Sequence, residues 1–365
     1  MKNELKDQAA MTGPEPLYYI HSQAPMRICD LGGWTDTWFA QFGQVLHMAV
    51  APYAQVQVAV YPRKARQERV EVFAENFAER FIVQLGLEPS AYRQAPHPLL
   101  QATIACIGAP QDLALEITIY SKTPSGASTG TSAAVSVALA AALDHLRGGH
   151  MTPYELAMLA HKVETEWLGQ QCGIQDQLCS AFGGIQLVEM HQFPHATATP
   201  LALSREVSLE LEQRLSLVYL GTTHKSSLVH EMVIAALEDA GPYALQLQRL
   251  RDIVPQGRDA LLCGDLQAFG QAMIANHETQ RALHPALINA VARKVIEIAQ
   301  AYGVLGWKVN GAGGEGGSLT LLSSPRRDVQ RLMLAEILSK IPSVRLIPMR
   351  FSSTGVQAWR MPGLW

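Results

Sequence analysis

The sequence predicts an α+β fold built from two domains, and three observations support that prediction. The chain has 365 residues, and about 150 residues per domain is usual. Strand-like segments crowd its first third with few helical patterns between them, whereas repeated βαβ units would alternate the two. Hydrophobic residues make up 48% and charged residues 17% of the chain. This balance is typical of a globular protein with a sizeable core.

The predicted strands of the first domain follow a polar lead-in. Residues 1–21 begin "MKNELKDQAAMTGPEP", which has no apolar core, so we expect a flexible lead-in before an N-terminal domain at 22–205. Two strand-like runs lie within 44–60, where "AQVQVAV" alternates apolar and polar residues. The same alternation at 68–75 and the run at 113–124 predict further strands.

Two helices are predicted next. Residues 131–146 are apolar on nearly every face, which indicates a buried helix. Residues 152–169 begin with Thr152 as a candidate N-cap, with Glu155 at the spacing of a capping box. Gly169 is a natural helix end.

The second domain, predicted at 206–365, mixes strands and helices. Its first strand is expected at 214–221, because "RLSLVYLG" is mostly apolar. The remaining predicted elements are helices over about 228–254, 256–276 and 284–302, a glycine-rich loop at 311–317, a strand at 318–322, a helix at 328–340 and a final strand at 344–353.

Composition argues against several classes of protein. The formal net charge is -3 and no run of Lys or Arg stands out, so no nucleic-acid partner is expected. The apolar segment at 133–143 is too short to cross a bilayer, which takes about 20 residues. The five cysteines form no C-x-x-C pair, which favours reduced thiols. We therefore expect a cytoplasmic protein without a membrane anchor, either a monomer or a homodimer.

The strongest motif is "TPSGASTGTSAAVSVALAAAL" at 123–143. Its glycines let the backbone approach an anion, and the free N–H groups at the start of the helix favour negative charge. Hydroxyls in the first turn can reach a phosphate-bound magnesium ion. The loop is no Walker A motif, because no Lys follows the last glycine. A glycine- and serine-rich turn before a buried helix is the alternative.

Two further segments could carry chemistry. In "VETEWLGQQCGIQDQLCSAFGG" at 163–184, Glu164 on a firm helix suits a magnesium ligand, and Asp176 in a loop suits an acceptor of a hydroxyl proton. A surface Glu and a turn Asp are the alternative. In "KVNGAGGEGGSLTLL" at 308–322, five glycines within seven residues indicate a backbone that packs closely on phosphates or on the first loop. A flexible hairpin is the alternative there.

Together and in order, these segments resemble those of the GHMP kinases, a superfamily that includes galactokinases, homoserine kinases and mevalonate kinases. "APMRICDLGGWTDT" looks like the first motif of the family, "PSGASTGTSAA" like the second and "VNGAGGEGG" like the third. The resemblance covers the chain from about residue 22 onward. "GGWTDT" and "GIQDQLCSAFGG" look closest to the sugar 1-kinases, the branch of L-fucokinase domains and D-glycero-D-manno-heptose 7-phosphate kinases.

The resemblance implies a fold and a chemistry. The fold would combine an N-terminal domain like domain 2 of ribosomal protein S5 with a ferredoxin-like C-terminal domain. The activity would be ATP-dependent phosphorylation of the anomeric hydroxyl of a sugar or sugar phosphate, with Mg²⁺. Asp176 would take the hydroxyl proton, Arg27 would lie near the transferred phosphoryl group, and Ser132 and Glu164 would hold Mg²⁺.

The resemblance also implies two sets of binding residues. The residues expected at the ATP phosphates are Pro124, Gly126, Ser128, Thr129, Gly130, Thr131, Ser132 and Ala133. Those expected at the sugar are Gly33, Trp34, Thr35, Asp36, Gln175, Gly311 and Gly313. Trp34 could stack on the apolar face of a sugar or belong to the core.

The chain departs from the family at two points. Ser128 stands where the second motif usually has its first glycine, which is expected to stiffen the loop. Glu315 interrupts the third motif, and a carboxylate aimed at a triphosphate would repel it, so we expect Glu315 to face away or to bind a cation.

Several alternatives remain for the function. A galactokinase-like or mevalonate-branch kinase fits the same motifs, and so does a sugar sensor without catalysis, although Arg27, Glu164 and Asp176 together disfavour a sensor. A heptose 7-phosphate would need a cationic pocket, for which "THKSS" at 223–227 and Arg350 are candidates. Without such a pocket, a neutral sugar such as L-fucose is favoured.

Overall fold

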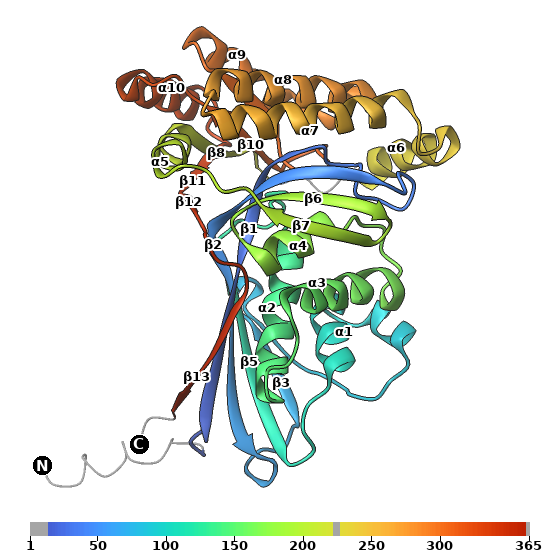
Figure 1. The fold of residues 1–365 in the computed structure, drawn as a ribbon. Coiled ribbons are helices and arrows are strands. Elements are labelled where there is room, and N and C mark those ends of the chain that lie inside the picture. Colours follow the sequence, from blue (N-terminus) through green and yellow to red (C-terminus); the bar gives the residue numbers. More distant parts are fainter. Residues whose placement is uncertain (1–13, 222–226, 363–365) are drawn as a thin grey trace, which may run out of the picture.

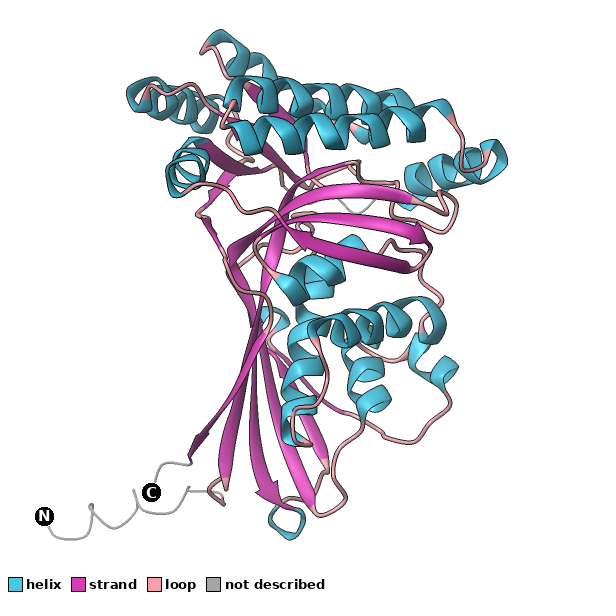
Figure 2. Ribbon diagram, viewed as in Figure 1, coloured by secondary structure: helices cyan, strands magenta, loops and turns pink. Residues whose placement is uncertain are grey.

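Two sheets and the helices packed on them make up the protein, as a computed structural model shows for residues 14–221 and 227–362 (Figure 1). Helices and strands are mixed throughout, which confirms the predicted α+β class (Figure 2). The larger sheet has nine strands, in the order β13-β1-β2-β5-β3-β4, with β12 and β6 also paired to β2, and β7 to β6. The smaller sheet has the order β11-β8-β10-β9.

The larger sheet consists of β1 (Tyr18–Leu31), β2 (Gly43–Pro62), β3 (Val70–Ala74), β4 (Glu79–Ile82), β5 (Leu113–Ser121), β6 (Ile185–Gln192), β7 (His195–Pro200), β12 (Arg350–Phe351) and β13 (Gln357–Pro362). Its pairs are antiparallel except for β3 with β5. On one side of it lie α1 (Pro98–Ile107), α2 (Thr131–Leu146), α3 (Pro153–Lys162) and α4 (Gln175–Phe182) (Figure 1).

The smaller sheet consists of β8 (Leu215–Tyr219), β9 (Gly306–Val309), β10 (Ser318–Leu322) and β11 (Arg345–Ile347), all antiparallel to their neighbours. The helices of this half are α5 (Arg205–Arg214), α6 (Ser227–Ala240), α7 (Leu245–Cys263), α8 (Leu266–Leu283), α9 (Ala290–Ala301) and α10 (Arg327–Lys340). One apolar core runs through both halves, because Leu217, Val254 and Phe269 pack in the same cluster as Ile28 and Leu139.

Local signals placed two helices correctly. Helix α2 begins at Thr131 and buries ten of its side chains, as its apolar faces predicted. At the start of α3, the Thr152 hydroxyl accepts from the Glu155 amide and the Glu155 carboxylate accepts from the Thr152 amide, which confirms the capping box. The predicted helix at 152–169 ends in a π-helical turn at Val163–Trp167, two residues before Gly169.

The predicted break between helices at residue 255 is wrong, because α7 continues through Pro255. Proline cannot donate to the carbonyl four residues earlier, which is that of Arg251. The Gln44 side chain donates to this carbonyl instead, at 3.0 Å. The real breaks lie at Gly241 and Gly264, both in the left-handed region where glycine is favoured.

Three boundaries predicted from the sequence also need correction. Tyr18–His21 belong to β1 and pair with both β2 and β13, so the lead-in does not extend to residue 21. The two strand runs at 44–60 form the single strand β2. The segment at 344–353 divides into β11 and β12, and the chain from 350 to 362 returns to the larger sheet, so it does not belong to a separate C-terminal domain.

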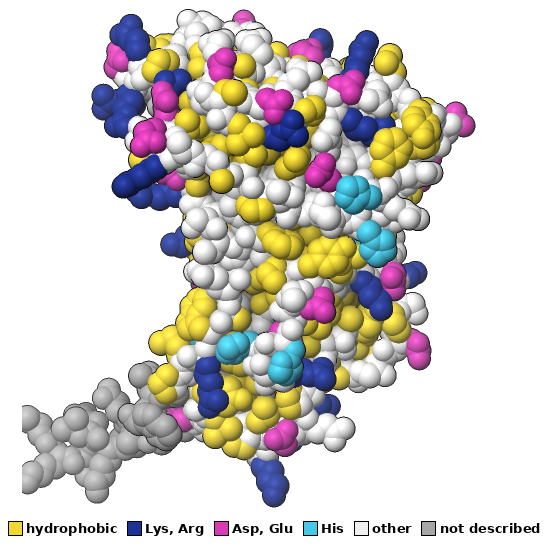
Figure 3. All heavy atoms as spheres, viewed as in Figure 1, with side chains coloured by type: hydrophobic (Ala, Val, Ile, Leu, Met, Phe, Trp, Pro, Cys, Tyr) yellow, Lys and Arg dark blue, Asp and Glu magenta, His cyan; other side chains and the backbone are white. Residues whose placement is uncertain are grey.

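The surface mixes charge signs on the face drawn in Figure 3, where Lys and Arg lie among Asp and Glu over the C-terminal helices. Among the helices of the described part of the chain, none is long and apolar enough to cross a membrane. All five cysteines are free thiols.

Candidate active site

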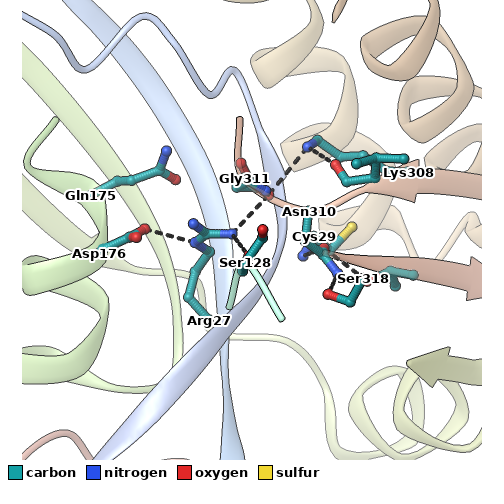
Figure 4. A network of polar contacts seen from close by, with 12 residues as sticks. Arg27, Cys29, Ser128, Gln175, Asp176, Lys308, Asn310, Gly311 and Ser318 are labelled. Carbon is teal, nitrogen blue, oxygen red and sulfur yellow. Dashed lines mark hydrogen bonds and ion pairs between the residues drawn. The ribbon is translucent and has the colours of Figure 1, made fainter. Parts of the chain in front are cut away.

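A cavity of about 430 Å³ lies where the three glycine-containing motifs meet. Most of the residues predicted from sequence line it, namely Arg27, Trp34, Asp36, Gly126, Ser128, Thr129, Gly130, Thr131, Ser132, Ala133, Glu164, Gln175, Asp176 and Gly311. Segments far apart in the chain therefore converge on one site, at the ends of β1 and β9 and the N-termini of α2 and α4 (Figure 4).

Four predicted residues lie outside the lining, for identifiable reasons. Pro124 precedes the loop. Gly33 backs onto a neighbouring carboxylate, since a Cβ there would lie 2.7 Å from Asp30 Oδ2. Thr35 is buried and donates to the carbonyl of Gly32 at 2.7 Å. A Cβ on Gly313 would lie 2.4 Å from the carbonyl oxygen of Leu287, so this glycine packs against protein.

The loop before α2 packs directly on the third glycine-rich segment. The amide of Gly317 donates to the carbonyl of Gly126 at 3.1 Å, and the Ser318 hydroxyl donates to the carbonyl of Ala127 at 2.6 Å. Ser128 has a φ of 55°, in the left-handed region, as expected where the family has glycine. The sequence predicts that the third segment packs either on phosphates or on the first loop, and this contact is with the first loop.

The central polar contact joins Arg27 of β1 to Asp176, which lies in the first turn of α4 and not in the predicted loop (Figure 4). Arg27 Nε donates to Asp176 Oδ1 at 2.8 Å, and Arg27 Nη1 donates to the carbonyl of Ser128 at 3.0 Å. Although burial opposes the charge, Asp176 and Asp30 raise the pKa of Arg27, so the guanidinium stays protonated. A Cβ on Gly130 would lie 3.1 Å from Asp176 Cγ, so this glycine lets the loop approach the carboxylate.

Asp36 forms a buried polar pair with Gln175. Its Oδ2 accepts from the amide of Gln175 at 3.0 Å, and its Oδ1 accepts from the Gln175 side chain at 3.4 Å. Burial, together with the charge of Asp176, raises the pKa of Asp36 to about 6. Both side chains line the cavity, where a carboxylate can accept hydrogen bonds from hydroxyl groups.

Glu164 lies in the π-helical turn and is 7% exposed. Its Oε1 accepts from Gln177 Nε2 at 2.9 Å. Burial raises the pKa of Glu164 to about 7, so a cation beside it would favour its ionised form. Ser132, in the first turn of α2, lines the same cavity.

Trp34 belongs to both the core and the cavity. It is 9% exposed and packs with Phe39, Val233 and Leu247, yet it also lines the cavity. Its Nε1 is buried without a partner among the described residues. Trp34 can therefore pack in the core and still present part of its ring to a sugar in the cavity.

Sequence reasoning missed several residues of the site. Asp30 and His230 line the cavity, and Lys308 contacts Asp30 from β9. Asp30 and Lys308 could have been identified from the sequence. Each is the one charged residue in an otherwise apolar segment, at 28–31 and 305–309. Nothing in the sequence around His230 indicated its position, which depends on where α6 packs.

Of the two candidates for binding a substrate phosphate, the structure describes Arg350 in full and only the backbone of Ser227 from the segment at 223–227. Arg350 is exposed on β12 and does not line the cavity. Residues 223–226 of the other candidate segment lie outside the described residues, as does the side chain of Ser227. Glu315 is exposed and absent from the lining, as expected for a carboxylate that faces away.

The chain matches a known family in both halves. Residues 99–184 match the family described as GHMP kinases N terminal domain, and residues 258–335 match GHMP kinases C terminal. A bifunctional fucokinase/GDP-fucose pyrophosphorylase from Arabidopsis thaliana is 26% identical over 313 residues, which are 82% of this chain and 29% of that protein. The chain thus spans less than a third of that relative.

Other relatives and solved structures agree on the fold. A D-glycero-alpha-D-manno-heptose 7-phosphate kinase from Campylobacter jejuni is 24% identical over 249 residues, 68% of this chain and 72% of that protein. A D-glycero-D-manno-heptose 1-phosphate kinase structure from Bacteroides thetaiotaomicron has a TM-score of 0.68 at 21% identity, covering 93% of this chain and 98% of that one. A Lactococcus lactis galactokinase complexed with galactose has a TM-score of 0.68 at 17% identity, covering 93% and 95%.

Proposed function

The chain is a GHMP kinase, with both domains of that family, and we propose that it transfers the γ-phosphoryl group of ATP to the anomeric hydroxyl of a neutral sugar. One observation favours a sugar as the substrate. Four buried polar atoms that belong to residues lining the cavity have no partner in the described structure, namely Asp30 Oδ2, Trp34 Nε1, Gln175 Oε1 and Gln177 Oε1. Unpaired buried polar groups are costly, so a ligand with several hydroxyl groups suits this wall.

Charge supports a neutral sugar over a sugar phosphate. Among the described residues that line the cavity, Arg27 is the one Lys or Arg, and it already contacts Asp30 and Asp176. The wall around Trp34 also contains Trp38 and Phe39, which suits an apolar sugar face such as one with a methyl group. L-Fucose has that character, and heptose 7-phosphate is the second candidate, because a relative has that name.

GHMP kinases use ATP as phosphate donor, and a second cavity supports a place for its nucleoside. This cavity has a volume of about 260 Å³ and shares Gly126, Thr131 and Ser132 with the first. Its walls are mainly apolar, and Thr123 Oγ1 is buried there without a partner in the described structure. An adenine ring in this cavity would leave the phosphates over the loop at the start of α2, where N–H groups favour anions.

The donor atoms in the cavity also suit Mg²⁺. In the described part of the chain no three His, Cys, Asp or Glu side chains come together to hold a metal. Mg²⁺ commonly binds one or two protein oxygens together with substrate phosphates, so the Glu164 carboxylate and the Ser132 hydroxyl are sufficient. When bound there, Mg²⁺ would neutralise charge on the phosphate oxygens.

The residues of this chain then supply positioning and charge. Asp176 accepts the proton of the anomeric hydroxyl as that oxygen attacks the γ-phosphorus. Arg27 and the N-terminus of α2 offset the charge that develops on the transferred phosphoryl group. Asp36 and Gln175 orient the sugar through its other hydroxyls, so that the attacking oxygen is in line with the bond that breaks.

The proposed function is tested by coupled ADP release with L-fucose, heptose 7-phosphate, galactose, arabinose, glucuronate and mevalonate. We expect a neutral sugar to give the highest kcat/KM, and ³¹P NMR to identify the product as a sugar 1-phosphate. Highest turnover with heptose 7-phosphate would refute the neutral-sugar assignment. Turnover with mevalonate alone, or with none of the six, would refute the sugar kinase.

Replacing Glu164 with Gln should raise the Mg²⁺ concentration for half-maximal activity by at least about tenfold, because a neutral amide is a poor ligand for Mg²⁺. The measurement is initial rate against free Mg²⁺ at saturating ATP. Glu166→Gln is the matched control, since Glu166 lies on the same turn with its side chain 67% exposed and should leave the curve unchanged. Equal Mg²⁺ curves for both variants would exclude Glu164 as a ligand.

A further inference from the structure

A row of four alternating charges, three of them buried, connects Lys308 of the smaller sheet to the catalytic Asp176. Lys308 Nζ of β9 lies 3.2 Å from Asp30 Oδ1 of β1. Arg27 Nη1 lies 3.3 Å from the same oxygen, and Arg27 Nε lies 2.8 Å from Asp176 Oδ1. The side chains of Lys308 and Asp30 are each 1% exposed, so these contacts are poorly screened by solvent.

The contacts of Arg27 leave one guanidinium nitrogen for a ligand. Nε donates to Asp176, and Nη1 donates to both Asp30 and the carbonyl of Ser128. No described residue accepts a hydrogen bond from Nη2, which lies 3.3 Å from the position a Cβ would take on Gly311, a residue of the cavity lining. The planar guanidinium is thus held at two of its three nitrogens, with the third at the cavity.

Asp30 is itself held by further contacts besides those with Arg27 and Lys308. Its Oδ1 also accepts from the amide of Gly311 at 3.1 Å, and the packing on Gly33 leaves no room for a side chain beside Oδ2. Burial alone would raise the pKa of Asp30, but Lys308 and Arg27 hold it below its ordinary value, so the group is a carboxylate. Its orientation therefore determines where Nη1 of Arg27 lies.

A purely structural role explains this pair poorly. Buried ion pairs are often no more stabilising than well-packed apolar side chains, because desolvation offsets their attraction. Here the pair spans residues 278 positions apart and touches the one Lys or Arg among the described lining residues. We propose that Asp30 and Lys308 are positioning residues that fix the Arg27 guanidinium so that Nη2 faces the transferred phosphoryl group. This inference rests on the proposed function.

The test compares Asp30→Asn with the double variant Asp30→Asn/Lys308→Met, which leaves no unpaired charge. For Asp30→Asn we expect kcat to fall by about 10- to 100-fold through misplacement of Arg27, while KM for ATP and sugar changes little. In the double variant the melting temperature should recover towards that of the wild type, but kcat should stay low. Recovery of kcat along with the melting temperature would show that Asp30 only neutralises Lys308, and would overturn the proposal.

Two further measurements serve as controls for this test. Asp328→Asn, which removes an exposed carboxylate paired with Arg326, is the matched control and should leave kcat unchanged. The Arg27 Nε–H NMR signal reports the guanidinium without any turnover, and should broaden in the double variant but stay sharp in Lys308→Arg. An unchanged signal in the double variant overturns the proposed positioning role of Asp30 and Lys308. If the wild type is inactive on every sugar, that result counts against the proposed function. The NMR comparison still tests whether Asp30 and Lys308 position Arg27.

Discussion

Replacing Asp176 with Asn is expected to lower kcat by about 10²- to 10⁴-fold, the range for loss of a general base, while ATP affinity stays nearly unchanged. Asn has almost the same shape as Asp, and its Oδ1 can still accept from Arg27 Nε, which donates at 2.8 Å in the native protein. The amide cannot take the proton from the sugar hydroxyl. The change therefore removes proton acceptance and largely keeps the local geometry.

The measurement pairs kcat from coupled ADP release with the Kd for ATP from calorimetry. Asp259→Asn, which alters an exposed Asp paired with Arg258, is the control for removal of one negative charge. Near-normal turnover of Asp176→Asn would exclude Asp176 as the proton acceptor. A loss of ATP affinity as large as the loss in kcat would assign it to nucleotide binding instead.

Local chemistry explains what could be predicted from the sequence. The start of α2 and the capping box at Thr152 each depend on residues within a few positions of one another. Such signals can be read from one segment, because helix starts have local backbone requirements. The three ordered motifs lie far apart in the chain, and residues from each of them line one cavity.

The features below, which the sequence did not predict, depend on contacts between distant segments. The continuity of α7 across Pro255 needs Gln44, 207 positions away from the carbonyl that it satisfies. The return of β12 and β13 to the larger sheet depends on pairing with β2 and β1, at the other end of the chain. No local pattern encodes which remote residue will supply such a partner. The same holds for Asp30 and Lys308.

Replacing Arg27 with Met is expected to reduce both catalysis and stability, because Arg27 makes a buried ion pair with Asp30 and a part-buried one with Asp176. Loss of one preorganised donor of positive charge typically costs about 10²- to 10³-fold in kcat. Removing one partner of a buried ion pair typically destabilises a protein by about 3–5 kcal/mol. Asp30 keeps Lys308 as a partner at 3.2 Å, and the Asp176 side chain is 29% exposed, so we expect the stability loss at or below the lower end of that range.

Two companion variants separate charge from shape. Arg27→Lys keeps the positive charge but loses the planar fork that reaches Asp176 and Asp30 together, so it should recover more stability than kcat. Arg258→Met breaks an exposed pair with Asp259 and should cost no more than about 1 kcal/mol. Urea unfolding and kcat are measured for all three. If Arg27→Lys restored kcat in full, the role of Arg27 would be that of a point charge, and the fixed direction of its guanidinium would have no part in catalysis.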